Sequence, residues 1–193
     1  MNKLRCIIFF LLLPLFVSTA QNTVNVDNTH YMLRQNKEQT LYKAKGYLIN
    51  LLGSSINVTK LEADPISSTE SGELTTIVYS CDEKNRRGML FGFFNDVWNK
   101  EGVIYSSYAF KNFTYEQTLE LVERLDQVID ENMEYLKKDQ KTNNIYFDYD
   151  DITFVIYYDN KIKMRLFWNN FDSEWESLSF GWLKKRLQQR ENK

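Results

Sequence analysis

Apolar residues recur at helical spacing in two segments of the chain. Glu38–Leu52 carries leucines and an alanine three or four residues apart, and Gly53 suits the left-handed stop that ends many helices. The stronger pattern is Thr114–Lys138, which opens with Thr114 and Gln117 at the spacing of a capping box. Its apolar stripe consists of Val122, Leu125, Ile129, Met133 and Leu136. A sheet or another helix must cover this stripe.

Other segments are rich in β-branched and aromatic residues and are separated by polar turns. These predicted strands are Ile56–Leu61, Leu74–Cys81, Arg87–Phe94, Val103–Phe110, Ile145–Tyr149, Ile152–Tyr158 and Lys161–Trp168. Residues 64–72, which include Pro65 and Gly72, are the longest loop signal. Short strands joined by short polar turns are typical of an antiparallel meander.

The turn between the last two predicted strands sets how they pair. Asp159-Asn160 suits a two-residue hairpin turn, which would place Val155 opposite Met164 and Tyr157 opposite Ile162 on the core face. The other face would then combine aromatic residues with cations: Phe154, Ile156, Tyr158, Lys161, Lys163 and Arg165. Two hypotheses remain open for this mixed face. It is either a binding surface or a surface covered by one of the helices.

The chain ends in a helix that includes Leu183–Gln189, and the start of this helix has two interpretations. Ser173 and Glu176 could form a second capping box, or Trp175–Phe180 could be a final strand. With either one, the pattern predicts an α+β fold: a curved antiparallel sheet of about six to eight strands packed against two or three helices.

The N-terminus has the three parts of a secretory signal peptide. Lys3 and Arg5 form a basic start, an apolar run follows, and small residues end at Ala20, which predicts cleavage before Gln21. The apolar run is too short for a membrane anchor, so we expect no membrane span after cleavage and a secreted or periplasmic protein. Residues 21–37 are polar and lack periodicity, which predicts a mobile arm. Residues 38–193 then form a single domain.

Charge and cysteine content narrow the class of protein further. Loss of Lys3 and Arg5 with the leader takes the formal net charge from −2 to −4. A mildly acidic chain with dispersed cations does not fit a nucleic-acid binder, which usually carries a basic excess. Cys81 is the one cysteine outside the leader. The domain therefore has no internal disulfide, and we expect Cys81 to be buried.

The residues that most enzymes need are scarce. His30 is the one histidine, and no nucleophile elbow, phosphate loop, dinucleotide fingerprint or Cys/His metal pattern occurs. We therefore predict no catalytic residue, metal or cofactor. Asp148, Asp150 and Asp151 are interpreted as turn residues, with a calcium site as the alternative. A small secreted hydrolase using a carboxylate pair or Cys81 remains the alternative function, and it would require a deep pocket with converging titratable groups.

Aromatic residues are the unusual feature of the composition, at 15% of the chain. Antiparallel sheets use such residues for packing, but exposed ones also anchor glycans and protein partners. We therefore predict an exported, non-catalytic binding or interaction module for a glycan or a protein partner. The candidate ligand contacts are Phe154, Tyr158, Trp168 and Trp175.

Overall fold

The structure is a computed structural model that describes residues 26–69, 72–140 and 142–191. The predicted leader, residues 1–20, lies outside the described residues. The chain divides into two compact units, Met1–Met32 and Leu33–Lys193. Both sheets and all the contacts described below belong to the second unit.

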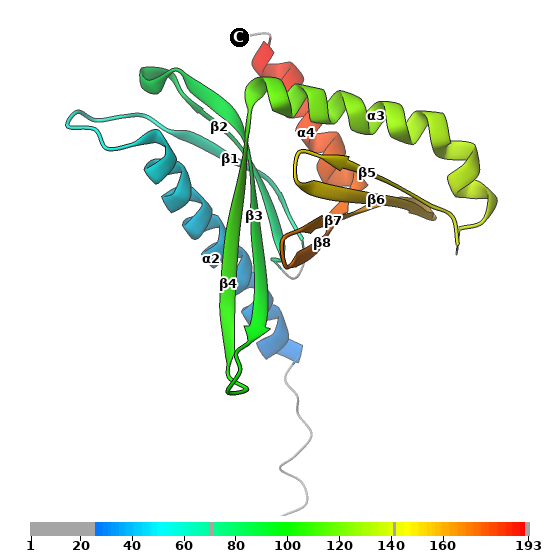
Figure 1. Ribbon diagram of the computed structural model, residues 1–193. Coiled ribbons are helices and arrows are strands. Elements are labelled where there is room, and N and C mark those ends of the chain that lie inside the picture. Colours follow the sequence, from blue (N-terminus) through cyan, green and yellow to red (C-terminus); the bar gives the residue numbers. More distant parts are fainter. Residues whose placement is uncertain (1–25, 70–71, 141, 192–193) are drawn as a thin grey trace, which may run out of the picture. The chain divides into compact units, whose positions relative to one another are not determined.

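Within the described residues the fold is α+β, with three helices and two antiparallel sheets of four strands each (Figure 1). The helices are α2 (Val26–Leu52), α3 (Tyr115–Lys138) and α4 (Ser177–Glu191). Sheet A has the order β1 (Glu62–Ser68), β2 (Leu74–Cys81), β3 (Arg86–Trp98) and β4 (Ile104–Thr114). Sheet B has the order β5 (Asn144–Tyr149), β6 (Ile152–Asp159), β7 (Lys161–Trp168) and β8 (Phe171–Glu176). The predicted fold class is confirmed, with the strands divided between two sheets.

Sheet A is covered on both faces. Ala44 and Leu48 of α2 pack against Ile77 and Leu90 on one face. The opposite face belongs to the larger core that includes sheet B, α3 and α4. This double cover explains why β2 is buried without interruption from Leu74 to Tyr79. A strand with one solvated face would alternate between buried and exposed residues.

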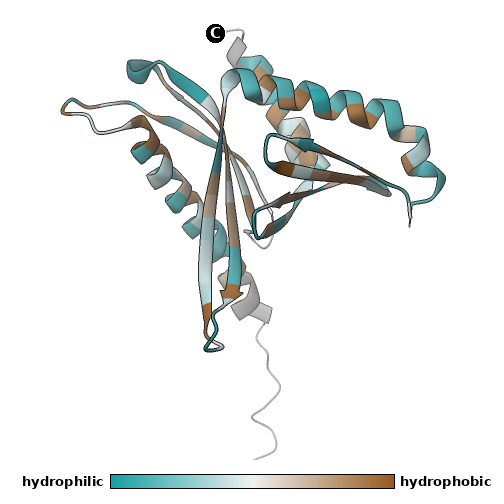
Figure 2. Ribbon diagram, viewed as in Figure 1, coloured by the Kyte–Doolittle hydropathy of each residue, from teal (hydrophilic) through white to brown (hydrophobic). Residues whose placement is uncertain are grey.

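The helix α3 begins and packs as its sequence pattern predicts. Gln117 donates its amide N–H to the Thr114 hydroxyl (3.2 Å), and Thr114 donates its own to the Gln117 side chain (2.9 Å), which completes the capping box. Buried residues of its stripe, Leu125, Ile129 and Leu136, join the core of the two sheets. Figure 2 shows the resulting alternation of hydrophobic and hydrophilic positions along this helix.

The start of α2 differs from the prediction. The helix begins at Val26, twelve residues before Glu38, so most of the segment predicted as an arm is helical. Thr40, Ala44 and Leu48 are fully buried and anchor the helix on sheet A. Once tertiary packing has fixed those turns, each further residue adds a backbone hydrogen bond at little cost, so the helix continues without an apolar stripe.

The first strand also lies elsewhere than predicted. Ile56 and Val58 are exposed and belong to no strand, whereas β1 occupies residues 62–68 and overlaps the predicted loop, residues 64–72, over residues 64–68. Pro65 misled the prediction, since proline usually ends a strand. Here β1 is an edge strand with a register shift between Pro65 and Ser67, and an edge strand tolerates a residue that lacks an N–H group.

The predicted register of the β6–β7 hairpin is wrong by one residue. Phe154 pairs with Leu166 and Ile156 with Met164, while Asn160 takes the left-handed conformation (φ 57°) in the turn. The observed register places four large apolar side chains together on the core face. The predicted register would have placed Phe154 and Ile156 opposite cations. Burial of the more apolar face of β6 therefore decided the pairing.

Neither interpretation of the C-terminal region holds as predicted: a strand is present, but it lies four residues earlier than Trp175–Phe180, and residues 177–180 belong to the helix. The strand β8 runs over Phe171–Glu176 and pairs with β7, and α4 begins directly after it at Ser177. Ser173 and Glu176 belong to this strand, so they do not form a capping box. Among the described residues, no helix combines the length and the apolar character needed to cross a membrane.

Candidate functional site

The four aromatic residues predicted as ligand contacts do not form a common exposed surface. Phe154 and Trp175 are 0% and 1% exposed, so they belong to the core. Tyr158 and Trp168 are half-buried and pack against that core. The Lys137 ammonium of α3 lies 5.5 Å from the centre of the Tyr158 ring. The predicted mixed face does not form, because the observed register separates its members: Phe154, Ile156 and Tyr158 lie on the core side, while Lys163 and Arg165 lie on the opposite face of sheet B. For the aromatic members, the structure favours the hypothesis in which a helix covers them.

The predicted aspartate turn holds a lysine. The Lys111 ammonium of β4 lies 2.7 Å from Oδ2 of Asp150 and 2.5 Å from Oδ1 of Asp151. Asp150 has a left-handed φ of 56°, as a turn residue does, and Asp148 accepts a hydrogen bond from Thr153 (2.6 Å). Among the described side chains, no group of three or more His, Cys, Asp or Glu residues could hold a metal ion. These contacts favour the turn interpretation, and the lysine joins the turn to sheet A.

This ion cluster leads to a pH-dependent prediction. Hydrogen bonds from Lys111 and Trp168 lower the pKa of Asp151 below its ordinary value of 3.8. The ionised Asp151 therefore stabilises the fold at pH values above 3.8, and this stabilisation is lost as the pH falls through the pKa of Asp151 in the folded state. Burial lowers the pKa of Lys111, but the hydrogen bonds to the two aspartates outweigh it and the net pKa is raised. We expect Lys111→Met to reduce the free energy of unfolding by about 1 kcal/mol at neutral pH, and the difference to vanish in strong acid. Urea unfolding at both pH values measures it.

A matched control for this prediction is Lys184→Met. Lys184 bonds Asp126 at 2.8 Å, but both side chains of this pair are more exposed than Lys111, so the loss should be smaller. If Lys111→Met costs the same at every pH, its effect comes from the packing of the lysine stem and not from the ion pairs.

The outer face of sheet B carries paired charges. Arg165 donates to both carboxylate oxygens of Asp172 (2.6 and 2.8 Å) across the β7–β8 pair. Lys163 lies 3.1 Å from Asp159 and 3.9 Å from Glu174. These two cations therefore already have acidic partners. Such cross-strand pairs are typical of a solvated sheet face and leave little unsatisfied charge for a ligand.

A polar hollow of about 560 Å³ lies where α2 ends, next to the β2–β3 turn and the start of α3. Tyr79 donates its hydroxyl to Asn112 (2.8 Å) in its wall, and burial raises the pKa of Tyr79. Cys81 also lines this hollow, as the hydrolase alternative requires. Catalytic groups of a hydrolase that uses Cys81 would therefore have to line this hollow.

The groups in this hollow do not assemble into a catalytic pair. The Cys81 side chain is 1% exposed, and its sulfur lies 4.0 Å from a Glu83 carboxylate oxygen. The pKa of Glu116 is lowered by a hydrogen bond from the backbone amide of Glu116 and by a second one from the Thr114 hydroxyl. A general acid needs a raised pKa instead. None of the side chains that the structure describes is a histidine. These contacts lend no support to the hydrolase hypothesis.

A second hollow has three aromatic side chains in its lining, and we call it the aromatic groove. It has a volume of about 470 Å³ and lies between α2 and β4. Its lining consists of Gln39, Tyr42, Lys43, Gly46, Tyr47, Asn50 and Phe110. The α2 members form two adjacent rows at intervals of four residues, which places them on one side of the helix. From Gln39 to Asn50 the groove lining extends about 16 Å along the helix axis.

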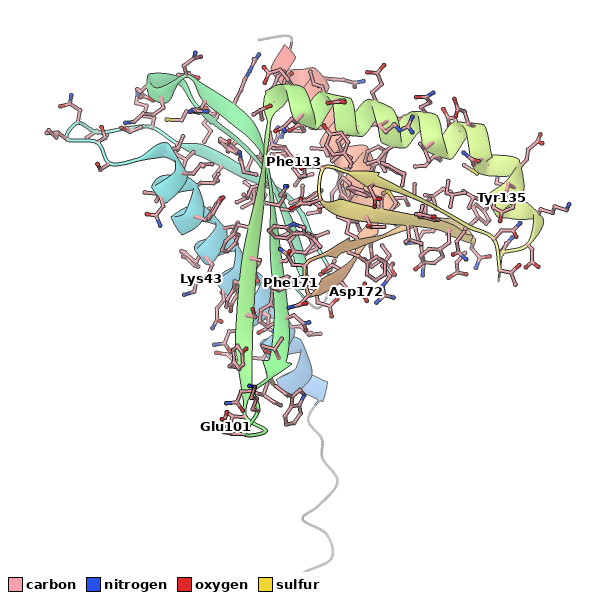
Figure 3. The ribbon with its side chains drawn as sticks, viewed as in Figure 1. Lys43, Glu101, Phe113, Tyr135, Phe171 and Asp172 are labelled. Atoms are coloured by element: carbon pink, nitrogen blue, oxygen red, sulfur yellow. The ribbon has the colours of Figure 1, made fainter. Side chains whose placement is uncertain are left out.

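The walls of the aromatic groove are held by contacts between α2 and sheet A. The rings of Tyr47 and Phe110 stack with centroids 5.1 Å apart. Tyr108 donates its hydroxyl to Gln39 (3.0 Å), and the Lys43 ammonium, labelled in Figure 3, lies 5.8 Å from the Tyr108 ring centroid. These contacts fix one wall. Tyr42 on the other row is 74% exposed, so its ring is available to a ligand.

Gly46 forms the notch in the groove. A Cβ atom at this position would meet no other atom within 4 Å, so packing does not require a glycine there. Glycine in the middle of a helix costs up to about 1 kcal/mol relative to alanine. The sequence pattern shows this glycine at its unfavourable position, but only the neighbouring rings reveal that it opens a groove. Sequence reasoning therefore missed the site although one signal was present.

The fold and the groove together define an α+β protein with a ring-lined groove on one side of its first sheet. Comparisons with protein-family models, curated proteins and solved structures found no match to this chain. The chemistry of the groove itself therefore carries the functional argument.

Proposed function

We propose that the protein is a non-catalytic binding module and that it holds its ligand, a glycan, in the aromatic groove. The observation that carries this proposal is the open notch at Gly46, between the exposed ring of Tyr42 and the stacked rings of Tyr47 and Phe110. A helical glycine that lowers stability without a packing reason, next to the exposed ring of Tyr42, is better explained by an approaching ligand than by the fold.

The rings of the groove suit the apolar face of a sugar. A pyranose ring has a face of C–H groups and a rim of hydroxyls, so it needs a flat apolar contact together with hydrogen-bonding groups. Tyr42, Tyr47 and Phe110 supply the apolar contact. Aromatic side chains provide a large contact area and lose few rotamers on binding.

The polar groups of the groove suit the hydroxyl rim. Gln39 and Asn50 carry amides, each of which has donors and an acceptor, and they lie at the two ends of the groove lining along α2. Lys43 is the one charged residue among those that line the groove. A neutral sugar, or one with a single acidic group, fits this lining better than a highly charged polymer does.

The test combines changes that fill the notch with a change that removes a ring. Gly46→Ala should increase the free energy of unfolding by up to about 1 kcal/mol, and so raise the melting temperature, because the added methyl group meets no neighbour. Gly46→Gln should fill the notch, and Tyr42→Ala should remove the exposed ring. Each of the latter two changes should weaken glycan binding roughly tenfold or more without lowering the melting temperature by more than a few degrees. Binding is measured on a glycan array and then by calorimetry.

Gly181 provides the matched control. It lies within α4, a Cβ atom there would also meet nothing within 4 Å, and neither Gly181 nor any other residue of α4 lines the groove. Gly181→Ala and Gly181→Gln should change stability as the Gly46 variants do and leave glycan binding unchanged. Binding that survives both Gly46→Gln and Tyr42→Ala would exclude the groove as the site. A different outcome is that the protein binds no glycan but binds a protein partner, and that Gly46→Gln and Tyr42→Ala abolish this binding. The groove would then be the binding site, and its ligand would be a protein instead of a glycan.

A further inference from the structure

The strand β4 is an edge strand of sheet A with an unusual composition. No described strand pairs with its outer side. Its first seven residues, Ile104–Phe110, contain no charged residue, no proline and no glycine, and most have high β-propensity. Ile104 and Tyr105 are 52% and 53% exposed. Such an uncharged segment on an edge is a template for pairing with another strand.

The other sheet edges are protected. The strand β1 contains Pro65 and a register shift, and its Asp64 pairs with Arg186 of α4 (2.6 Å). The edge strand β5 of sheet B carries the acid Asp148, which accepts a hydrogen bond from Thr153. The strand β8 alternates core residues with the acids Asp172, Glu174 and Glu176. Proline, bulges and charge are usual means of blocking edge pairing, and the first seven residues of β4 have none of them.

The hairpin turn before β4 holds this edge in an extended conformation. The Asn99 side chain accepts hydrogen bonds from the amides of Glu101 (3.0 Å) and Val103 (2.8 Å), and the Asn99 amide donates to the Val103 carbonyl (2.9 Å). Figure 3 labels Glu101 at this end of the hairpin. At the other end of the segment, Lys111 is held by the aspartate turn. The free edge is thus ordered before any strand joins it, which lowers the entropy cost of pairing.

We propose that the β4 strands of two copies of this chain pair antiparallel about a two-fold axis at Ser107. In this register Ile104 lies opposite Phe110 of the second copy, and Tyr105 lies opposite Ala109 of the second copy. Apolar side chains meet apolar side chains on both faces, and no like charges face each other over the paired segment. The two copies of sheet A become one continuous sheet of eight strands.

A second copy fits this edge better than an open-ended assembly does. Two-fold pairing uses the same surface on both copies and therefore closes after two. Each copy offers one unprotected edge, so the pairing cannot propagate into a fibre. Phe110 also lines the aromatic groove, so the pair would carry two grooves close to the shared axis, each with Ile104 of the other copy beside it.

The test is the oligomeric state of the purified protein, measured by sedimentation velocity across the micromolar range. We expect a dimer that dissociates on dilution. Ile104→Lys and Tyr105→Lys should each weaken it roughly tenfold or more, since a buried, unpaired lysine replaces an apolar pair. Both positions are exposed in the single copy, so at low protein concentration the melting temperature of each variant should equal that of the unmodified protein.

Leu178→Lys is the control, because Leu178 is a similarly exposed apolar residue (60%) on α4. It should dimerise as the unmodified protein does. A protein that stays monomeric throughout the concentration range would overturn the proposal. The β4 edge would then be a candidate for pairing with an extended segment of a different protein. A dimer that persists unchanged in both lysine variants would also overturn it. Glycan binding is measured separately, and its presence or absence leaves this result unaffected.

Discussion

Trp175→Ala should reduce the free energy of unfolding by about 4 kcal/mol, because it removes the largest fully buried side chain of the shared core. The Trp175 ring on β8 lies 5.1 Å from Phe91 of sheet A and 5.5 Å from Phe180 of α4, measured between ring centroids. It therefore joins three layers, and its loss leaves a cavity that none of them can fill alone. Chemical unfolding followed by far-UV circular dichroism measures the change.

Trp175→Phe separates packing from the indole N–H group. This N–H is buried and has no hydrogen-bond partner among the described residues, so phenylalanine removes an unsatisfied donor as well as some volume. We expect Trp175→Phe to cost much less than Trp175→Ala. If Trp175→Ala left stability unchanged and abolished ligand binding instead, Trp175 would be a ligand contact and its position in the core would be wrong.

Gly88→Ala should reduce the free energy of unfolding by about 3 kcal/mol, the upper end of the usual cost of overpacking. A Cβ atom at residue 88 would overlap the carbonyl oxygen of Phe113 on β4 and lie 3.1 Å from the Tyr79 hydroxyl. The overlapping atom belongs to the backbone, so no side-chain rotation relieves it. Either the β3–β4 pairing opens locally or the strand shifts. Equilibrium unfolding of the purified variant measures the loss.

Gly92→Ala on the same strand and the same face is the control. There the Cβ would lie 3.3 Å from an edge atom of the Phe110 ring and 3.6 Å from the Ala44 side chain. A ring can move by a few tenths of an ångström, so this variant should lose less stability than Gly88→Ala. Equal losses would show that any side chain in this part of β3 is unfavourable, and that the Phe113 carbonyl is not the cause.

The local parts of the fold were predictable from the sequence. The capping box of α3, the bounds of β2 and β7 and the glycine after α2 each depend on residues close together in the chain. In each case one interaction dominates, such as the two reciprocal hydrogen bonds between Thr114 and Gln117. Local chemistry and tertiary packing agree at these positions, so the pattern was sufficient.

The parts that failed depend on which surface becomes buried. The β6–β7 turn permits two registers, and the sequence of the turn alone favoured the wrong one. Only the match between Phe154 and Ile156 on β6 and the apolar face of β7 selects the observed register. The aromatic groove likewise depends on Phe110 of β4 meeting Tyr47 of α2, a contact between residues far apart in the chain.

The meander order of both sheets has a consequence for how the chain folds. Every strand pairs with the strand before or after it in the sequence, so no pairing requires a long loop to close first, and such local topologies fold quickly. We expect the two sheets to pack together late in folding, because their contacts join distant parts of the chain: Ser173 donates a hydrogen bond to the carbonyl of Glu73 (3.2 Å), a hundred residues earlier. The contact between the rings of Phe91 on sheet A and Trp175 on sheet B would form at the same stage. Before sheet B is synthesised, the core face of sheet A has no cover from it, so we expect the nascent chain to be prone to aggregation at that stage.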